Sequence, residues 1–274
     1  ALGGGDAAQR AIPFGISLEM IHNFTLVHDD IMDDDDVRRG RNSVHVEFDL
    51  PTAINAGDAL FARAFEVLLE TRADDATVRR LVGMVATMVR EIGEGQQDDM
   101  EMERGEGVTL ERYLTMIEKK TARMFQAAAS GGVLIAGGTE EQVRAMDEYG
   151  RRIGLGFQVW DDLLDLTADQ ETLGKPVGSD LLEGKRTALV LHFLENCSDA
   201  QRQTFGRAFE KREAGQAEVA TAVGAMRDAG TLDYGTALAL EHADRAREML
   251  GVLPDGPAKD SLAGLVDFMV KRKS

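Results

Sequence analysis

Cysteine is almost absent from the sequence, which has only Cys197 among its 274 residues. A single cysteine excludes an internal disulfide and fits a reducing compartment. No apolar run reaches the length of a membrane-spanning helix, and no signal peptide is recognisable. From these absences we expect a cytoplasmic protein without an integral membrane segment.

Proline and the aromatic residues are also scarce. Aromatic residues make up 5% of the sequence, and the prolines lie early or late in the chain, at Pro13, Pro51, Pro176, Pro254 and Pro257. The long proline-free middle is rich in Ala, Leu, Met, Glu and Arg, which favours long helices. Because no segment alternates between apolar and polar residues as a strand would, we expect an all-α bundle.

Helical periodicity and capping residues predict where the longer helices begin and end. We expect them at residues 13–33, 52–71, 77–103, 109–135 and 139–166, with Thr77 capping the third and Thr109 the fourth. Residues 33–41 and 167–185 are expected to be polar loops, and about four or five shorter helices to fill the rest. No linker divides the chain, so we expect one domain over residues 1–274.

Negative charge dominates the composition, since 48 Asp and Glu face 31 Lys and Arg, for a net charge of −17. Such an excess argues against a nucleic-acid partner and against simple adsorption to an anionic membrane. Lysine is also scarce beside arginine, as in salt-adapted proteins, although an acidic mesophilic protein would look the same.

A dense run of acidic residues lies in one stretch between Phe24 and Arg41. Six aspartates fall within eight residues there, at Asp29, Asp30, Asp33, Asp34, Asp35 and Asp36. The first three are spaced i, i+1 and i+4, which places them close together on one helix face. Three hard oxygen donors suit Mg²⁺, which proteins hold with a few carboxylates and phosphate oxygens. Arg38 and Arg39 offer donor forks for phosphate, although a lone aspartate run would more often be a solvated loop.

A second segment, between Gly156 and Leu166, repeats the same spacing at Asp161, Asp162 and Asp165. Its flanks are Phe, Val, Trp and Leu, so a solvated acidic face is the wrong description. Carboxylates inside an apolar helix need a partner, and a shared metal–diphosphate cluster would supply one. Two such segments could face each other across a helical bundle.

With this pair of motifs the chain resembles the trans-isoprenyl diphosphate synthases, or polyprenyl synthetases, which carry a first and a second aspartate-rich motif. The resemblance covers nearly the whole chain. It implies a bundle of roughly ten or more helices around a central cavity, the isoprenoid synthase fold. It also implies a Mg²⁺-dependent condensation of isopentenyl diphosphate with an allylic diphosphate, with about three ions on the bound diphosphate, and a homodimer.

Shorter motifs follow in the family's order and assign further residues by resemblance. Catalytic positions would be Asp29, Asp30, Asp33, Lys120, Thr121, Gln158, Asp161, Asp162 and Asp165. Diphosphate would be bound by Arg38, Arg39, Lys120, Lys175 and Lys185, and metal by Asp29, Asp33 and Asp161. Gln96, Asp99 and Asp180 match family positions beside these groups. Thr121 and Gln158 would offer oxygen dipoles to the carbocation that forms when diphosphate leaves.

Product length can be argued from the helix that carries the first motif. The growing chain should run down an apolar tunnel along this helix, so that Phe24 and Thr25, a turn or more before Asp29, form its floor. Only two residues separate Asp30 from Asp33, so the motif lacks the insertion of bacterial-type enzymes. An aromatic residue at position 24 without that insertion resembles archaeal geranylgeranyl diphosphate synthases. The alternative is that Phe24 is ordinary core.

One departure from the family concerns the second substrate. The family's upstream GKxxR segment, which binds isopentenyl diphosphate, has no counterpart before Ile12, and the chain begins without Met. We therefore expect that an upstream segment is missing. This leaves Arg39 and the terminal Lys271, Arg272 and Lys273 for that site.

The function that these features favour is geranylgeranyl diphosphate synthesis. A farnesyl or farnesylgeranyl diphosphate synthase is an alternative, as is a non-catalytic partner subunit of a prenyl synthase. A terpene cyclase shares the bundle and the first motif, but such enzymes usually replace the second motif with an Asn/Ser/Glu pattern. His28 has no Cys or second His at ligand spacing, which argues against a zinc site.

Overall fold

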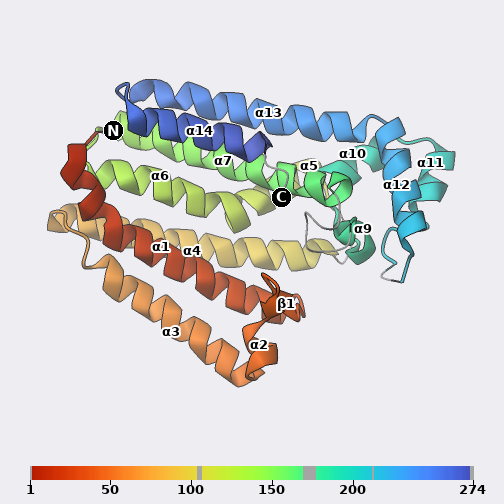
Figure 1. Cartoon of the computed structure of the whole chain (residues 1–274), viewed down its shortest axis with the longest axis horizontal. Helices are drawn as coiled ribbons and strands as arrows, with labels where there is room; N and C mark the ends of the chain where they lie inside the picture. Colours follow the sequence, from red (N-terminus) through yellow and green to blue (C-terminus); the bar gives the residue numbers. More distant parts are fainter. Residues whose placement is uncertain (1, 104–106, 169–176, 212, 272–274) are drawn as a thin grey trace.

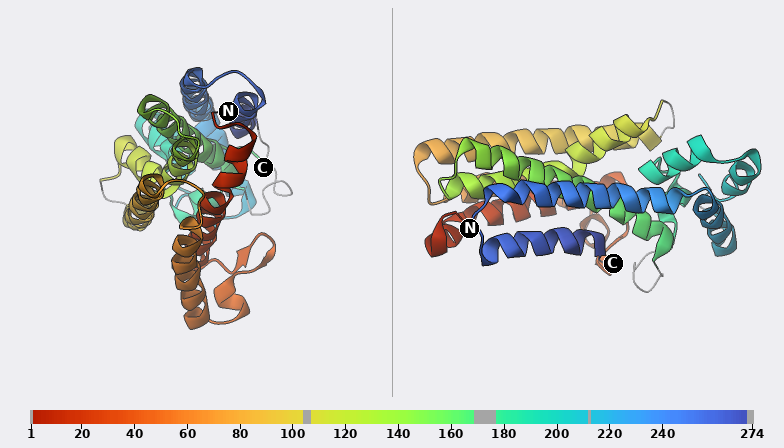
Figure 2. Two further views of the ribbon diagram at one scale, coloured as in Figure 1. Left: turned by 90° about the vertical axis from the view of Figure 1, so that its left-hand side faces the viewer. Right: turned by 90° about the horizontal axis from the view of Figure 1, so that it is seen from above.

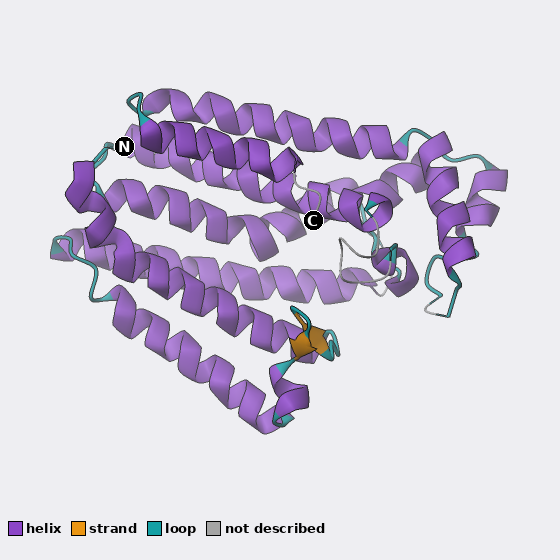
Figure 3. Cartoon of the chain, viewed as in Figure 1, coloured by secondary structure: helices purple, strands orange, loops and turns teal. Residues whose placement is uncertain are grey.

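The computed structural model describes residues 2–103, 107–168, 177–211 and 213–271 of the chain. Its longer helices are α1 (Gly4–Met32), α3 (Leu50–Leu68), α4 (Asp75–Glu103), α6 (Arg123–Ile135), α7 (Glu140–Thr167), α12 (Gln216–Asp228), α13 (Thr231–Met249) and α14 (Pro257–Lys271). The shorter ones are α2 (Val44–Glu47), α5 (Leu110–Ile117), η1 (Glu118–Ala122), α9 (Ser179–Glu183), α10 (Ala188–Asn196), α11 (Asp199–Phe205) and η2 (Leu250–Val252). Helix dominates (Figure 3), so the all-α prediction is confirmed.

The longer helices other than α12 run roughly side by side, as Figures 1 and 2 show. Helix α7 packs against α6, α13 and α14, and α6 in turn contacts α1 and α4. Helix α3 lies at the edge of the bundle and packs mainly against α1. The short helices α10 and α11, together with α12, gather at one end of the molecule (Figure 1).

Two clusters of buried apolar side chains hold this arrangement together. The larger one joins α1, α4, α6, α7, α13 and α14 and includes Phe14, Ile21 and Ile153. The smaller one lies among α10, α11 and α12 and includes Phe193 and Phe205. None of the described helices is both long and apolar enough to cross a bilayer. The assignment of residues 1–274 to a single domain stays a prediction.

The predicted helix starts at Thr109 and Thr139 are confirmed by their caps. The side chain of Thr109 accepts a hydrogen bond from the backbone N–H of Arg112 at 3.2 Å. Thr139 and Gln142 form a complete capping box before α7. The prediction that Thr77 caps α4 is wrong. Asp74 precedes that helix and accepts from both the backbone N–H and the hydroxyl of Thr77, because its carboxylate is the better acceptor.

Two predicted boundaries are corrected by the structure. Helix α1 begins at Gly4 rather than near Pro13, so Pro13 lies inside it; the buried Phe14, Leu18 and Ile21 anchor this helix in the core and offset the lost backbone hydrogen bond. The loop after α1 contains a small hairpin, in which β1 (Val37–Arg38) pairs with β2 (Arg41–Asn42). Its two turn residues both have positive φ, as a tight hairpin requires.

Candidate active site

The first aspartate motif lies at the C-terminal end of α1, and its members have different surroundings. Asp30 is buried, with 3% of its surface exposed, and accepts a hydrogen bond from Nε of Arg38 at 2.7 Å. Nη2 of Arg38 donates a second bond to the same oxygen. The hairpin returns the chain toward α1 and so places Arg38 against Asp30. If Arg38 binds diphosphate as predicted, it must do so while its guanidinium is also hydrogen-bonded to Asp30.

A lysine from another element lies among the remaining carboxylates. Nζ of Lys120, on η1, is 2.7 Å from Oδ2 of Asp99 and 3.9 Å from Oδ1 of Asp29. Burial alone would lower the pKa of Lys120, but Asp99 and Asp29 raise it overall, so the ammonium stays charged. Asp33 lies nearby, 3.4 Å from Nε2 of Gln96 on α4. Three helical elements thus bring one cation and three carboxylates together, all from residues that the sequence motifs had singled out.

The three aspartates of the second motif, on α7, also differ in their surroundings. Asp161 is exposed, whereas Asp162 and Asp165 are 5% and 2% exposed. The carboxylate of Asp165 accepts from Oγ of Ser179 at 2.7 Å and from the backbone N–H of Asp180 at 3.2 Å. Asp165 therefore fixes the start of α9. Two of the three predicted catalytic carboxylates thus accept hydrogen bonds from the protein itself, and the catalytic role of all three stays a prediction.

Asp162 bonds to two other side chains. It accepts hydrogen bonds from the hydroxyl of Tyr113, on α5, and from Nε2 of Gln158 at 3.1 Å. Burial raises the pKa of Asp162 well above its ordinary value, and Asp180 adds to this, while the hydrogen bonds from Tyr113 and Gln158 oppose it. Tyr113 could not be selected from the sequence alone, since only the fold brings α5 beside α7.

Helix α9 brings the two motifs into one site. Lys185, just after it, lies 2.9 Å from Glu183 and 3.5 Å from Asp180. Its charge also reaches the first motif: burial raises the pKa of Asp33, and Lys120 and Lys185 oppose that rise. Lys175 lies outside the described residues. Arg39 is exposed in the hairpin turn.

Lys120 and Thr121 belong to a π-helical turn, η1, between α5 and α6. The helix predicted over residues 109–135 is present, but the sequence did not predict the π-helical turn inside it. Glycines on two neighbouring helices let those helices pack closely against the turn. A Cβ on Gly95 of α4 would lie 2.5 Å from the backbone nitrogen of Lys120, and one on Gly154 of α7 would lie 2.4 Å from Cα of Ala122. Such π-turns inside helices are frequent at functional sites.

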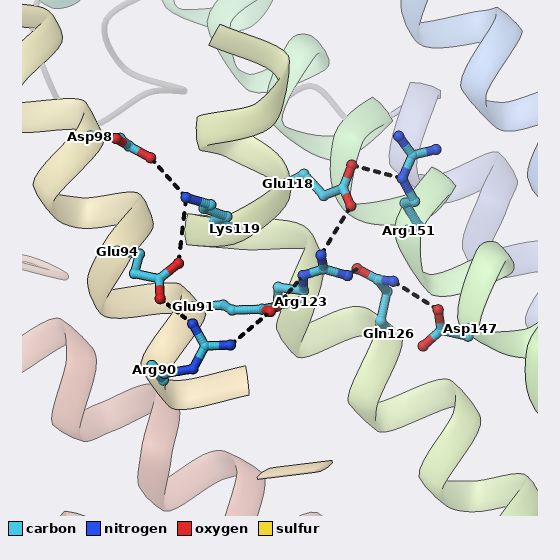
Figure 4. A network of polar contacts seen from close by, with 10 residues as sticks. All are labelled: Arg90, Glu91, Glu94, Asp98, Glu118, Lys119, Arg123, Gln126, Asp147 and Arg151. Carbon is cyan, nitrogen blue, oxygen red and sulfur yellow. Dashed lines mark hydrogen bonds and ion pairs between the residues drawn. The ribbon is translucent and has the colours of Figure 1, made fainter. Parts of the chain in front are cut away.

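Ion pairs tie the same turn to its neighbours (Figure 4). Glu118 accepts from Nε of Arg151, on α7, at 2.7 Å, and it also pairs with Arg123 at 3.4 Å. Arg123 continues to Glu91 on α4, with 2.5 Å between Nε and Oε2. The network therefore links α4, η1, α6 and α7 and fixes the turn that carries Lys120.

Comparison with known proteins decides the family of this chain. Residues 1–226 match the family model of polyprenyl synthetases. The chain belongs to that family. As a polyprenyl synthetase it is a trans-prenyltransferase, and the prediction made from the two aspartate motifs is confirmed.

The relatives of this polyprenyl synthetase include several archaeal proteins. It is 42% identical to the geranylgeranyl diphosphate synthase of Methanosarcina mazei, over 98% of this chain and 81% of that protein. It is 44% identical to the geranylfarnesyl diphosphate synthase of Natronomonas pharaonis, over 94% of this chain and 74% of that protein. The crystal structure of geranylgeranyl pyrophosphate synthetase from Pyrococcus horikoshii superposes with a TM-score of 0.90 at 40% identity, over 96% of this chain and 80% of that one.

Phe24, the predicted floor residue, packs between α1 and α3. Its ring centroid lies 5.2 Å from that of Phe61 and 4.9 Å from that of His28, and Phe61 continues the row to Phe65 at 5.4 Å. His28 itself fills the space beside Gly57 of α3. The hydroxyl of Thr25 donates to the backbone oxygen of His22 at 2.8 Å. The role of Phe24 and Thr25 in chain length stays a prediction.

The carboxylates of this polyprenyl synthetase are suitable ligands for Mg²⁺. Among the described residues, no three acidic, His or Cys side chains converge closely enough to form a metal site by themselves. Asp29 and Asp33 are hard oxygen donors, and burial together with their mutual repulsion raises the pKa of Asp29. Such crowding favours an added cation, and Mg²⁺ usually completes its shell with water and substrate phosphate. The donor set therefore fits an ion that arrives with diphosphate.

The close packing of Gly95 against the π-turn can be tested by substitution. We expect Gly95→Ala to lower both turnover and Tm, because its Cβ would displace the backbone at Lys120. Gly93→Ala is the matched control, since Gly93 lies on the same helix with nothing within 4 Å of an added Cβ. That change should keep activity and stabilise the protein by about 0.5–1 kcal/mol. Equal behaviour of the two variants would contradict this account of the turn.

Proposed function

We propose that this polyprenyl synthetase condenses isopentenyl diphosphate with an allylic diphosphate to make all-trans geranylgeranyl diphosphate. The position of Lys120 carries the proposal: it lies between Asp29 of the first motif and Asp99, and Lys185 approaches from the side of the second motif. Cations interleaved with carboxylates suit a metal-bound diphosphate, since the ammonium groups bind phosphate oxygens and the carboxylates bind metal.

The first step breaks the bond between the allylic carbon and the diphosphate oxygen, and the diphosphate leaves with the bonding electrons. Lys120 and Lys185 would donate hydrogen bonds to its oxygens and stabilise the charge that develops there. About three Mg²⁺ ions, held by Asp29, Asp33 and Asp161, would neutralise the same charge. Lys175 is proposed to join these lysines on the basis of its motif.

The second step forms the new carbon–carbon bond with electrons from the double bond of isopentenyl diphosphate. A proton is then lost, and the departed diphosphate can accept it, so neither step needs a nucleophilic side chain. Thr121 donates from Oγ1 to Oε1 of Gln158 at 3.2 Å, which gathers both oxygen atoms beside the turn that carries Lys120. Oxygen dipoles at this place favour the positive charge of the intermediate.

The proposed product length rests on the relatives and on Phe24. The proteins from Methanosarcina mazei and Pyrococcus horikoshii are named for geranylgeranyl diphosphate, and the aromatic residue five positions before Asp29 supports the same length here. The relative from Natronomonas pharaonis is named for the longer geranylfarnesyl diphosphate. A longer product is therefore the second candidate, and analysis of product length separates the two.

The site for isopentenyl diphosphate is proposed to include Arg39. This residue is exposed at the tip of the hairpin, next to the Arg38–Asp30 pair, so its guanidinium can reach a second diphosphate near the first motif. Lys271, the terminal alternative, pairs with Asp267 at 3.0 Å. Arg272 and Lys273 lie outside the described residues.

A homodimer and a cytoplasmic location are part of the proposal. Helix α3 and the segment before it expose Val46, Phe48, Leu50 and Ile54, each with 41–69% of its surface accessible. These side chains form an apolar face that a second copy could cover. The single cysteine supports a reducing compartment. Sedimentation of the purified protein tests the dimer directly.

The decisive assay incubates the protein with Mg²⁺, an allylic diphosphate and labelled isopentenyl diphosphate. We expect the label to appear in a longer prenyl diphosphate, identified by chromatography after dephosphorylation. A cyclase would instead release a hydrocarbon from the allylic substrate alone. A non-catalytic subunit would incorporate label only when mixed with another prenyl synthase. Either result would overturn the proposal.

Lys120→Ala tests the proposed diphosphate contact. We expect kcat/KM for the allylic substrate to fall about 10- to 100-fold, because a charge-assisted contact of roughly 1.5–3 kcal/mol is removed. Lys119→Ala is the matched control. Lys119 is the adjacent residue of the same turn with similar exposure, but it pairs with Asp98 at 3.1 Å, away from the motifs. A similar loss in both variants would contradict the assignment of Lys120.

A further inference from the structure

A chain of hydrogen bonds connects the buried Tyr113 with the π-turn. The hydroxyl of Tyr113 donates to Oδ2 of Asp162, and Oδ1 of Asp162 accepts from Nε2 of Gln158 at 3.1 Å. Oε1 of Gln158 then accepts from Oγ1 of Thr121 at 3.2 Å. The chain crosses from α5 over α7 to η1. The two middle groups, Asp162 and Gln158, each have a partner on either side, so the orientation of Gln158 depends on that of Asp162.

The orientation of Gln158 matters because the two ends of its amide carry opposite partial charges. The carbonyl oxygen attracts a nearby cation, whereas the NH₂ group repels it. A half-turn about the last side-chain bond would exchange the two ends at almost no steric cost. Asp162 opposes this exchange, because its Oδ1 accepts from Nε2 of Gln158 at 3.1 Å and the exchange would break that bond. Tyr113 in turn holds that carboxylate in place.

We propose that Tyr113 is a positioning residue for carbocation formation, an inference that rests on the proposed function. It acts through Asp162 to keep the carbonyl oxygen of Gln158 turned toward the reacting carbon. In this account Asp162 orients Gln158, while Asp161, on the exposed face, binds metal. The alternative is that Tyr113 only fills the core, since it is 3% exposed and contacts the main apolar cluster.

Tyr113→Phe separates these roles, because it removes one hydroxyl and keeps the ring. We expect kcat for condensation to fall at least about tenfold while KM for both substrates changes less than about twofold, because the diphosphate-binding lysines are untouched. Two unreactive probes report on orientation itself: an allylic diphosphate analogue with an ammonium group at the cationic carbon, and an allylic thiodiphosphate with an uncharged chain. By calorimetry, the variant should bind the ammonium analogue about tenfold more weakly and the thiodiphosphate unchanged.

Tyr149→Phe is the matched control. Tyr149 is also 3% exposed, and its hydroxyl donates to the backbone oxygen of Leu262 at 2.9 Å, about 14 Å along α7 from Gln158. Loss of a buried tyrosine hydroxyl should lower Tm in both variants, but only Tyr113→Phe should weaken the ammonium analogue. If both variants bind the two probes alike, Tyr113 is a core residue and the inference is overturned.

A second variant keeps the inference testable if Tyr113→Phe does not fold. In Asp162→Asn the hydroxyl of Tyr113 would hold the amide oxygen, so the new NH₂ group would face Gln158 and draw its oxygen away from the cation. The same selective loss of the ammonium analogue is expected, and its absence contradicts the inference. Failure of the wild-type protein to extend any allylic diphosphate would instead refute the proposed function, because that assay does not depend on the variants.

Discussion

Asp29→Asn is expected to lower turnover on the order of a thousandfold, because the proposed site works as a unit of metal, carboxylates and diphosphate. Asp161→Asn should do the same, and the double variant should be little worse than either single one, since groups that act together are not additive. Incorporation of labelled isopentenyl diphosphate at saturating substrates measures this. Asp36→Asn, in the exposed part of the same aspartate run, should stay active. Near-normal activity of Asp29→Asn, or of the wild type in excess chelator, would contradict the metal proposal.

The same variant should not be less stable. Burial raises the pKa of Asp29, partly opposed by Lys120, so the folded state binds its proton more tightly than the unfolded chain does. Folding therefore loses stability as pH rises from the unfolded pKa, near 3.8, through the higher folded one, and the full cost is present at neutral pH. Asparagine removes that cost. We expect Asp29→Asn in chelator to melt at or above the wild-type temperature at pH 7, and the difference to vanish below pH 3.8.

This combination of lost activity and retained stability separates a functional residue from a structural one. A damaged fold would lower both quantities together. Carboxylates crowded for function often reduce the stability of the free protein, because selection acts on the site rather than on maximal stability. A clear fall in Tm for Asp29→Asn would show that the side chain holds the end of α1 in place.

The sequence predicted the elements of the site better than the partners of each side chain. The spacing of both aspartate motifs and the motif around Lys120 led to the family, and the structure places Lys120 between Asp29 and Asp99. Spacing could not show that Asp30 binds Arg38, or that Asp162 binds Tyr113, because those partners come from the hairpin and from α5. Helical periodicity gives the face of a residue on its own helix, but tertiary packing decides what that face meets.

The π-turn is the clearest feature that periodicity missed. Residues 109–135 have the pattern of one helix, and the interruption arises because α4 and α7 approach closely at Gly95 and Gly154. Both glycines lie inside predicted helices, where glycine is unfavourable by about 1 kcal/mol and therefore often has a packing reason. That reason could have been suspected from the sequence, but the residue that each glycine meets could not.

Phe24→Ala is expected to release products at least one isoprene unit longer than those of the wild type. Phe24 lies five residues before Asp29, about 7.5 Å along the helix axis, which is close to the length of one such unit. Its ring is partly buried and rests on Phe61, so its removal opens space between α1 and α3. A growing prenyl chain can fill that space with apolar contacts, and the product should lengthen.

Phe65→Ala is the control for this test, because Phe65 belongs to the same aromatic row and loses the same ring, but lies on the far side of Phe61. We expect it to lower Tm without changing the product. Chromatography of the dephosphorylated products beside a melting curve separates the outcomes. If Phe24 were only core, its removal would cost roughly 3–5 kcal/mol and leave product length unchanged. An unaltered product with a lowered Tm would therefore end the assignment of Phe24 as the floor, because the free volume would be a cavity rather than a place for substrate.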